Sequence, residues 1–327
     1  MELKTGEEVL VTDGRRILGT AYVRSLLGEG GQGWVYKATY DGRMYALKWL
    51  KGPLHPQEFR RNLENNIRDG APGRRGTFLW PLYMVTSRRN PSFGYLMELR
   101  PTDYVEFDDI YNGYELKHQG GRLVRVPCTL SSIRTMIAAA ANIVESFREL
   151  HLAGKSYQDL NGGGFYIHPK TGDLKIGDCD NVAMDGLNLG IKGFQGFEAP
   201  EVVRNEAYPG IDTDRYSLAV VLFRLFFRAD PLEGARLLKR PLQDDIDYIR
   251  AYGREPVFIF DPDNDSNRPV QEIHTNAVRM WGRYPEFFRE AFVQSFTEGL
   301  MHPARRLRET QWMDVLTRLY RYFYPRN

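Results

Sequence analysis

Apolar residues form short runs over the first hundred positions, each bounded by turn-forming residues. β-Branched and aromatic side chains are frequent in these runs, which predict extended strands around 8–11, 21–23, 34–38, 44–48 and 95–99. Asp41-Gly42, between the third and fourth runs, has the composition of a hairpin turn. A helix is expected over 56–68. The first hundred residues are therefore predicted to form a small sheet with one helix.

After residue 100 the apolar positions change to a helical period. From 131 to 150 they recur every three or four residues, and Gly154 follows as a stop signal. Further helices are expected at about 214–227, 284–299 and 309–323, with two short strands at 165–167 and 174–176. The segment 102–127 is predicted to be an irregular insertion. This part of the chain is therefore expected to be mainly helical.

Composition and charge exclude several classes of protein. The chain has 44 Lys and Arg against 42 Asp and Glu, with no long run of one sign, so a nucleic-acid partner is not expected. Cys128 and Cys179 form no closely spaced pair, which favours a reducing compartment. The N-terminus lacks the apolar core of a signal peptide, and the apolar run 216–227 is too short to span a bilayer. We therefore expect a cytoplasmic protein without a membrane partner.

Six short motifs follow one another in an order that suits phosphoryl transfer. Each motif supplies a different part of such a site, so the set is much stronger evidence than a glycine-rich turn alone. In chain order they are Gly28-Glu29-Gly30-Gly31-Gln32-Gly33-Trp34-Val35, Ala46-Leu47-Lys48, Tyr157-Gln158-Asp159, Asp178-Cys179-Asp180, Ala199-Pro200-Glu201 and Asp214-Arg215-Tyr216-Ser217.

The first two motifs are suited to holding phosphates. Gly28, Gly30 and Gly33 allow backbone N–H groups to approach an anion closely, although an ordinary glycine-rich hairpin would look similar. A strand follows this turn, whereas a helix follows a dinucleotide-binding loop. Lys48 on the next strand would pair with phosphates while a helix carboxylate holds it in place. Glu64 is the favoured carboxylate, and Glu58 is the alternative.

Together the motifs resemble eukaryotic-type protein kinases of the bacterial serine/threonine kinase group, from about residue 20 to 310. The resemblance implies an α+β, two-lobed protein-kinase-like fold that forms one kinase domain. Its β-rich, nucleotide-binding lobe would occupy 1–100 and its helical catalytic and substrate lobe 101–327. It also implies ATP and Mg²⁺ (with Mn²⁺ as an alternative), a protein substrate, and a cognate protein phosphatase as a partner.

The resemblance further implies a role for each matching residue. Asp159 would accept or orient the proton of the substrate hydroxyl, and Asp178 would bind Mg²⁺. Asp214 would anchor the catalytic loop, and Glu201 would pair with Arg306. The adenine ring would be bounded by Val35, Ala46, the gatekeeper Met97, the hinge backbone of Glu98 and Leu99, and either Phe165 or Tyr166.

Several positions near the expected metal site depart from the family pattern. Gly164 stands where the family has a metal-binding asparagine. Asp180 replaces a glycine, and in a locally extended segment its carboxylate would lie beside Asp178 and compensate; the alternative is a turn cap. Asn161 is a further candidate for contacting metal or phosphate. Tyr157 and Cys179 replace a histidine and a phenylalanine that pack together, and we interpret both as core residues.

The activation segment also departs from the pattern. Gln158 replaces the arginine that receives an activation-loop phosphate, and the segment 178–201 contains no Ser, Thr or Tyr. We therefore expect no phosphorylation switch in this loop. Phe194 replaces a threonine, which leaves the acceptor preference open. The leading expectation is ATP:Mg²⁺-dependent phosphorylation of protein Ser and Thr hydroxyls; the alternatives are a nucleotide-binding pseudokinase that acts as a scaffold, which Gly164 favours, and a small-molecule kinase.

Overall fold

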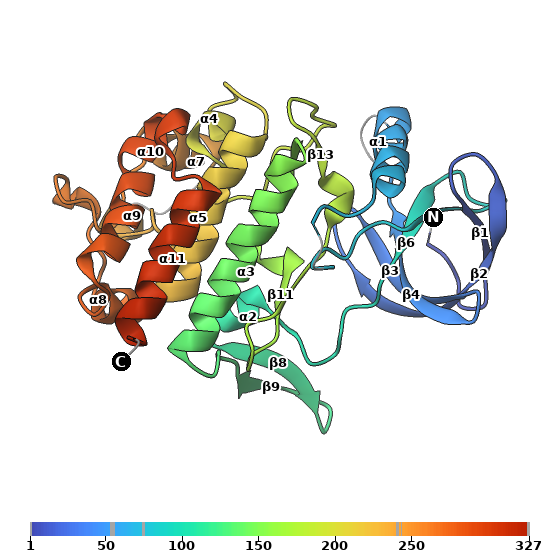
Figure 1. Cartoon of the computed structure of the whole chain (residues 1–327), viewed down its shortest axis with the longest axis horizontal. Coiled ribbons are helices and arrows are strands. Elements are labelled where there is room, and N and C mark those ends of the chain that lie inside the picture. Colours follow the sequence, from blue (N-terminus) through green and yellow to red (C-terminus); the bar gives the residue numbers. More distant parts are fainter. Residues whose placement is uncertain (1, 53–55, 74–75, 240–241, 243, 326–327) are drawn as a thin grey trace. The chain divides into compact units, whose positions relative to one another are not determined.

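A computed structural model describes residues 2–52, 56–73, 76–239, 242 and 244–325, which form two compact units (Figure 1). Unit 1 comprises Met1–Thr102 and Lys175–Ala183, and unit 2 comprises Asp103–Leu174 and Met184–Asn327. The sequence predicted a single division of the chain near residue 100, which would place 175–183 with the C-terminal part. This segment joins unit 1 because Ile176 exchanges backbone hydrogen bonds with Thr77 and Leu79.

Unit 1 is built on a closed antiparallel sheet. Its strands are β1 (Glu8–Thr12), β2 (Ile17–Glu29), β3 (Gly33–Tyr40), β4 (Arg43–Leu50), β5 (Tyr83–Thr86) and β6 (Phe93–Met97), in the order β1-β2-β3-β4-β6-β5. β1 pairs with both β2 and β5, which removes the free edges that an open sheet would expose. Val9, Val11, Ala21, Leu47 and Trp49 fill the interior. The predicted strands are confirmed, and the closure is an additional finding.

Helix α1 (Pro56–Asp69) of unit 1 confirms the predicted helix. Its buried residues are Phe59, Asn62, Leu63 and Asn66, which recur at the three- and four-residue spacing of one helix face. Two of these four side chains are amides. The inward face of α1 is therefore partly polar, and its hydrogen bonds bear on the candidate site below.

Unit 2 is mainly helical. Its long helices are α3 (Ile133–Leu152), α5 (Ile211–Phe227), α9 (Glu286–Phe296) and α11 (Glu309–Phe323), and the shorter ones are α2 (Phe107–Asn112), α4 (Pro200–Val203), α6 (Ala235–Lys239), α7 (Asp245–Tyr248), α8 (Thr275–Trp281) and α10 (Glu298–Met301). The predicted helices are confirmed, although the one expected over 284–299 breaks at Thr297, between α9 and α10. Among the described residues, none of the helices combines the length and apolarity that crossing a bilayer requires.

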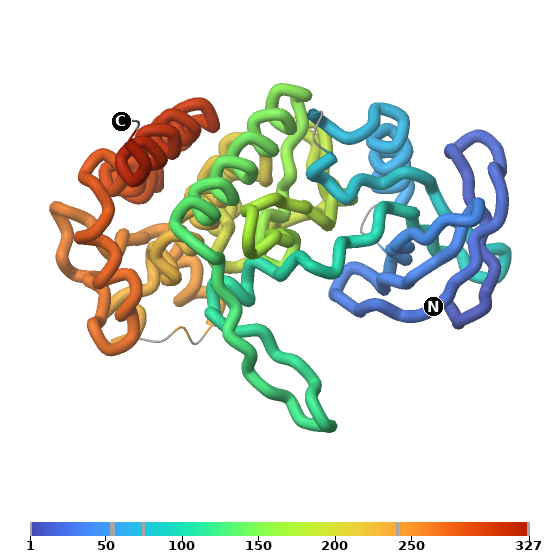
Figure 2. Tube along the Cα trace, turned by 60° about the horizontal axis from the view of Figure 1, so that its bottom comes forward, coloured from blue at the N-terminus to red at the C-terminus, as the bar shows by residue number. Residues whose placement is uncertain are grey.

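The segment 102–127 is ordered, so the prediction of an irregular insertion was wrong. It contains β7 (Val105–Glu106), helix α2, and a hairpin of β8 (Tyr114–Gln119) and β9 (Arg122–Pro127) that extends from the helices of unit 2 (Figure 2). Gly120 and Gly121 both have positive φ (58° and 78°), as a tight hairpin turn requires. The hairpin is largely exposed, and no residue of β8 or β9 is buried, although Tyr114-Glu115-Leu116-Lys117 alternates apolar and polar residues.

Short strands flank the two loops that carry the candidate chemistry. They are β10 (Lys155–Ser156), β11 (Phe165–Ile167), β12 (Leu174–Ile176) and β13 (Ala183–Met184). Each loop contains a 3-10 turn, Gly162–Gly164 in the first and Cys179–Asn181 in the second. The loop around Asp159 belongs to unit 2 and the loop around Asp178 belongs to unit 1.

Candidate active site

The glycine-rich turn connects β2 to β3 and leaves part of its backbone open. A Cβ atom added at Gly28 or Gly30 would meet nothing within 4 Å, so packing within the protein does not explain these glycines. Gly33 is different, since a Cβ there would lie 2.5 Å from the carbonyl oxygen of Trp49 on the paired strand. Gly28 and Gly30 therefore leave room for an anion, while Gly33 is required by the approach of β3 to β4.

Lys48 on β4 is a buried cation surrounded by oxygen atoms. Its side chain is only 5% exposed, and Nζ donates to Asp180 Oδ1 (2.8 Å), Asp178 Oδ1 (2.9 Å) and Gln32 Oε1 (3.2 Å). Burial lowers the pKa of the Lys48 ammonium, but the charges of Asp180 and Asp178 outweigh burial and raise this pKa above its ordinary value. Lys48 is therefore held protonated in unit 1.

Tyr95 on β6 completes this cluster. Its hydroxyl donates to Asp180 Oδ1 over 2.8 Å, the same oxygen that accepts from Lys48. Burial and then the neighbouring carboxylates raise the pKa of Tyr95 well above its ordinary value, so the hydroxyl keeps its proton. No sequence motif pointed to Tyr95; its position two residues before the predicted gatekeeper Met97, on the same side of β6, was the available signal.

The structure does not pair Lys48 with Glu64, so this prediction was wrong. Glu64 instead accepts a hydrogen bond from Arg60 Nε (3.0 Å), one turn earlier on α1. The buried positions of α1 are occupied by Asn62 and Asn66, whose amides both donate to the carbonyl oxygen of Val182 (2.8 and 2.7 Å). Glu64 lies beside this buried stripe and not within it.

The loop from Asp178 to Asn181 is compact, which corrects the expectation of a locally extended segment. Asp178 has a left-handed backbone conformation (φ 47°, ψ 34°), and Cys179–Asn181 form a 3-10 turn. A non-glycine residue in this region is strained, and such strain is common at functional sites. The turn nevertheless brings the carboxylates of Asp178 and Asp180 to the same ammonium group.

Asp178 and Asp180 differ in their suitability for a metal. The Asp178 side chain is 42% exposed and fits a carboxylate that holds Mg²⁺ together with phosphate oxygens and waters. Asp180 is fully buried, and its Oδ1 already accepts hydrogen bonds from Lys48 and Tyr95. These contacts do not fit the metal-binding role predicted for Asp180. Within the described ranges, no group of three or more His, Cys, Asp or Glu residues is arranged to hold a metal ion.

The candidate adenine-binding residues of unit 1 lie on paired strands. Ala46 pairs with Met97 across β4 and β6, and both side chains are buried. Val35 on β3 pairs with Lys48. Glu98 and Leu99 lie just beyond the end of β6, where their backbone is outside the strand. These are suitable positions for a purine pocket and a hinge, and the roles stay predictions.

The two candidate adenine contacts in unit 2, Phe165 and Tyr166, are distinguished by burial. Phe165 is fully buried and its ring packs among Phe107, Phe147 and Tyr157. Tyr166 follows it on β11, is only partly buried and points to the other face of the strand. Phe165 is therefore a core residue, and Tyr166 stays the predicted contact.

Asp214 anchors the loop that carries Asp159 in unit 2, as predicted. Its carboxylate is buried and accepts the backbone N–H groups of Tyr157 (2.6 Å) and Gln158 (3.0 Å). Gln158 has positive φ (70°), and the N–H of Asp159 bonds back to the carbonyl of Tyr157 (2.9 Å). These bonds fix the backbone that carries Asp159, whose catalytic role stays a prediction.

A buried histidine that the sequence analysis missed supports this anchor. His151 contacts Asp214 Oδ2 through Nε2 (3.1 Å) and Glu309 Oε1 through Nδ1 (2.8 Å). Burial lowers the pKa of His151, but the two carboxylates raise it to about 9. Burial raises the pKa of Glu309, but hydrogen bonds from His151 and Arg215 lower it to about 2. His151 is therefore an imidazolium that donates to both carboxylates at neutral pH.

Asn161 has a structural use within its own loop, and its contact with metal or phosphate stays a prediction. Its Oδ1 accepts from the N–H of Gly163 (3.0 Å), and its Nδ2 donates to the carbonyl of Asp159 (2.8 Å). A Cβ at Gly162 would overlap the carboxylate of Asp108. The three-glycine turn that ends at Gly164 is thus closed by Asn161, and the site has no side chain at position 164.

Tyr157 and Cys179 are core residues, as predicted. Both are fully buried, and the Tyr157 ring packs against Phe147. The Cys179 Sγ donates to the backbone carbonyls of Ile176 and Gly177. Burial, and then the charge of Asp180, raise the pKa of this thiol well above its ordinary value, so it stays protonated and unreactive.

Gln158 also holds the activation segment directly. Its Nε2 donates to the carbonyl of Leu187 (2.6 Å) and to Ser156 Oγ (3.1 Å), and its Oε1 accepts from Asn188 Nδ2 (3.3 Å). At the C-terminal end of the segment, Glu201 and Arg306 form the predicted pair through two hydrogen bonds of 2.7 Å each. The middle and the C-terminal end of the segment are thus held by side chains of unit 2 itself.

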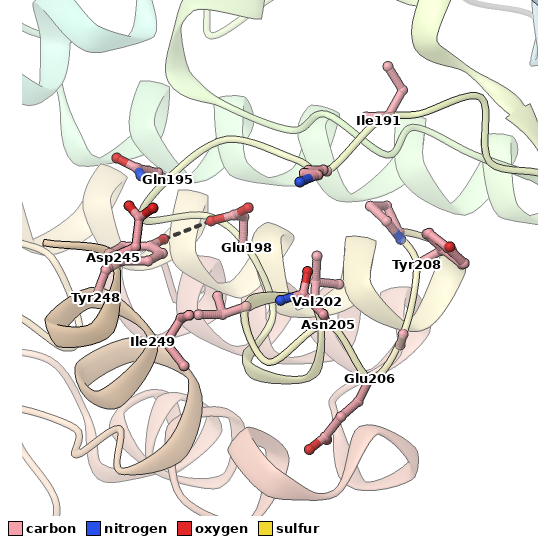
Figure 3. Close-up of a pocket in the computed structure, with 14 residues that line it drawn as sticks. Ile191, Gln195, Glu198, Val202, Asn205, Glu206, Tyr208, Asp245, Tyr248 and Ile249 are labelled. Atoms are coloured by element: carbon pink, nitrogen blue, oxygen red, sulfur yellow. Dashed lines mark hydrogen bonds between the residues drawn. The ribbon is translucent and has the colours of Figure 1, made fainter. Parts of the chain in front are cut away.

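A cavity of about 440 Å³ opens in unit 2 between the end of the activation segment and α7 (Figure 3). Glu198 points toward Tyr248, whose hydroxyl donates to its Oε2 (2.8 Å), and burial raises the pKa of Glu198. Asp245 and Glu206 also line the cavity. Phe194, in the same segment, is 54% exposed. Lys192 and the apolar side chains of Ile191, Val202 and Ile249 line the cavity as well, so the pocket is mixed in character, with more acidic than basic residues.

The chain is similar in sequence to plant protein kinases. It is 21% identical over 222 residues to serine/threonine/tyrosine-protein kinase HT1 of Arabidopsis thaliana, covering 66% of this chain and 53% of that protein. It is 26% identical over 231 residues to CBL-interacting protein kinase 29 of Oryza sativa subsp. japonica, covering 69% and 50%. The chain thus spans about half the length of these curated relatives. Protein-family models give no match.

The fold is shared with a bacterial kinase of known structure. The PknI kinase domain of Mycobacterium tuberculosis superposes with a TM-score of 0.60 and 15% identity, over 98% of this chain and 99% of that one. The predicted two-lobed α+β fold is therefore confirmed, and so is the predicted relationship to the protein kinases.

Proposed function

This chain has the protein kinase fold and is related to protein kinases in sequence, and we propose that it transfers the γ-phosphoryl group of ATP to Ser or Thr hydroxyls of a protein substrate. The observation that carries the proposal is the ion cluster of unit 1. Lys48 is held protonated against Asp178, whose carboxylate remains partly exposed. A fixed cation beside an accessible carboxylate suits a nucleotide polyphosphate with its metal.

Each retained residue has one task in the proposed reaction. Lys48 and the open backbone at Gly28 and Gly30 bind and orient the phosphates. Asp178 would hold Mg²⁺, which when bound supplies neutralisation of phosphate charge. Asp159 orients the substrate hydroxyl and accepts its proton. Catalysis of this kind rests on positioning and electrostatic stabilisation, so the fixed backbone of the Asp159 loop is part of the mechanism.

A pseudokinase is the second candidate, and one observation favours it. Position 164 has no side chain, and Asn161, the nearest amide, is bonded within its own loop. One metal-binding group of the family is therefore missing. The presence of Lys48, Asp159 and Asp178 together favours turnover over simple nucleotide binding.

A single-turnover assay separates the two candidates. Wild-type protein is mixed with γ-labelled ATP and a generic protein substrate, with Mg²⁺ or Mn²⁺, beside Asp159→Asn and Asp178→Asn. Label should move to protein in the wild type and fall at least about 100-fold in both variants. Asp69→Asn, which changes an exposed aspartate at the end of α1, is the matched control. Wild-type protein that binds ATP and transfers nothing would instead be a pseudokinase.

We further propose that the activation segment works without phosphorylation. Gln158 bonds Leu187 and Asn188 directly, where an arginine would require a phosphate between the two loops. The segment 178–201 also has no hydroxyl to modify. Treatment with a broad-specificity phosphatase, checked by intact mass, should leave the transfer rate within about twofold. A large loss of rate would contradict the absence of a switch.

The acceptor is the least constrained part of the proposal. Phe194 replaces a threonine of the family, and the cavity beside the same segment carries three acidic residues, Glu198, Glu206 and Asp245, against Lys192. We propose that a basic protein segment approaches this face. Phosphoamino-acid analysis of the labelled substrate identifies the acceptor hydroxyl, and a low-molecular-weight alcohol as the only acceptor would identify a small-molecule kinase instead.

A further inference from the structure

A buried ammonium such as Lys48 depends on a buried anion. Taking both charges out of water is costly, so the cation keeps its place only when a carboxylate with good geometry compensates it. The resemblance to protein kinases predicts that α1 supplies this carboxylate. The structure shows where the acidic residues of α1 are and what occupies its inner face.

Helix α1 offers no carboxylate to Lys48. Of its described residues, those buried in unit 1 are Phe59, Asn62, Leu63 and Asn66, and none of them is acidic. Glu58 is exposed, and Glu64 is bonded to Arg60. The helix is tied to the loop after Asp180 by neutral amides that donate to the Val182 carbonyl. The contact between α1 and this loop therefore does not involve the charge on Lys48.

Asp180 has the properties that the missing helix carboxylate would need. It is fully buried, and its Oδ1 lies 2.8 Å from both Lys48 Nζ and the Tyr95 hydroxyl. Its Oδ2 is also buried and has no hydrogen-bond donor among the described residues. The charge of Asp180 is therefore compensated chiefly by Lys48, the cation that the described residues of unit 1 bring to it.

Asp178 is unsuited to be the permanent anchor. Its side chain is 42% exposed, and the proposed reaction requires its carboxylate for Mg²⁺. A lysine held by Asp178 alone would lose its partner whenever metal binds. Because Asp180 lies on the protein side of Lys48 and Asp178 on the exposed side, the two carboxylates can have separate tasks.

We propose that Asp180 is the positioning residue that fixes Lys48 for nucleotide binding, in the place of the helix glutamate, with Tyr95 fixing Asp180. The inference rests on the proposed nucleotide-binding role of Lys48. It follows that Lys48 is positioned whether or not α1 brings a carboxylate to it. The α1 helix of this chain is consequently unable to control the site by making or breaking an ion pair with Lys48.

The test measures the state of Lys48 directly, so it does not depend on turnover. Purified full-length protein in EDTA is trace-labelled with an amine-reactive reagent over a range of pH, and modification of Lys48 is quantified by mass spectrometry. Wild type is compared with Asp180→Asn and Glu64→Gln, each of which removes one charge at nearly constant shape. Urea unfolding of each variant establishes that it is folded.

Asp180→Asn should make Lys48 reactive about one pH unit or more below the wild type, because the ammonium loses its buried anion. Glu64→Gln should label like the wild type. The same Asp180→Asn protein should bind ATP about tenfold more weakly in EDTA. Absence of phosphoryl transfer in the wild type would refute the proposed function and leave these labelling results interpretable.

Two outcomes overturn the proposal. If Glu64→Gln releases Lys48 and Asp180→Asn does not, the helix carboxylate is the anchor after all. If Asp180→Asn equals the wild type in EDTA and differs only when Mg²⁺ is present, Asp180 acts as a metal ligand. Should Asp180→Asn fail to fold, Tyr95→Phe takes its place: loss of the donor that fixes Asp180 should change Lys48 labelling by a smaller amount, and no change would count against the proposal.

Discussion

The two units contain buried ion pairs of similar geometry, but only those of unit 2 come from the positions that the family pattern predicts. In unit 2, Asp214 holds the catalytic loop and Glu201 pairs with Arg306. In unit 1, the expected pair of Lys48 with Glu64 is replaced by the pair of Lys48 with Asp180. Both units thus contain a buried carboxylate with a compensating partner, but in unit 1 the carboxylate comes from a different position than predicted.

The physical difference lies in what each carboxylate must contact. Asp214 accepts two backbone N–H groups and a histidine at once, so its carboxylate must be placed accurately with respect to three donors. Lys48 has a long, flexible side chain that needs one buried anion from any direction. A carboxylate that bonds several backbone groups is therefore hard to supply from another position in the chain. A carboxylate that pairs with a lysine is easier to supply from another position.

The largest effect is expected when the cation of unit 2 is removed. Arg306→Met should lower the free energy of unfolding by about 3–5 kcal/mol, because Glu201 is left buried without its partner. Chemical denaturation measures this loss. The double variant Arg306→Met, Glu201→Leu should recover part of it, and failure to recover anything would attribute the loss to the other hydrogen bonds of Arg306.

The matched change in unit 1 tests whether the relocated pair is equally strong. Lys48→Met should cost about 3 kcal/mol, because Asp180 loses its buried counter-ion, and addition of Asp180→Leu should restore much of it. Hydrogen exchange of β4 and β6 localises the effect to unit 1. Equal stabilities of Lys48→Met and the wild type would contradict a tightly coupled pair.

The pH dependence of stability distinguishes the unit 2 network from that of unit 1. The pKa of His151 is about 9 in the folded protein against 6.5 for the free side chain, so its contribution is complete below pH 6.5 and is lost as pH rises through about 9. Wild type should therefore lose up to about 3 kcal/mol relative to His151→Gln across this range. Glu309 acts in the opposite sense, since its contribution is lost only as pH falls from 4.5 through about 2. Parallel stability curves of the two proteins would rule out the charged His151.

A smaller effect is expected at the activation segment. Gln158→Ala removes the bonds to Leu187 and Asn188, at a cost of about 1–2 kcal/mol, and should accelerate amide hydrogen exchange in 185–193 by about tenfold. Ser156→Ala, which removes a bond of Gln158 outside the segment, is the control and should have a smaller effect on this exchange. Unchanged exchange in Gln158→Ala would show that other contacts hold the segment.

The smallest effect is expected at the position that the family pattern favoured. Glu64→Gln removes only a partly exposed pair with Arg60, so its cost should be about 0.5 kcal/mol or less. Thermal or chemical unfolding is sufficient to measure it. A cost comparable with that of Lys48→Met would place Glu64 back in the site.

The sequence by itself determined the long helices, strands β1 to β4 and β6, and the order of the motifs. The Asp214 anchor and the pairing of Glu201 with Arg306 were implied by the resemblance of those motifs to protein kinases. The helices and strands follow from apolar periodicity, whereas the two contacts follow from the match of each residue to the family pattern. The closure of the sheet in unit 1 and the order of 102–127 depend on strand pairing, which local composition does not encode.

Only the tertiary structure decided the partner of Lys48 and the uses of Asp180, Asn161 and His151. Each of these polar side chains could bond several different groups, and the sequence pattern does not select one of them. The choice among them is made by burial, since an ion or amide removed from water must bond whatever group the fold brings within about 3 Å. The left-handed turn at Asp178, which carries Asp180 to Lys48, exists only in the folded chain.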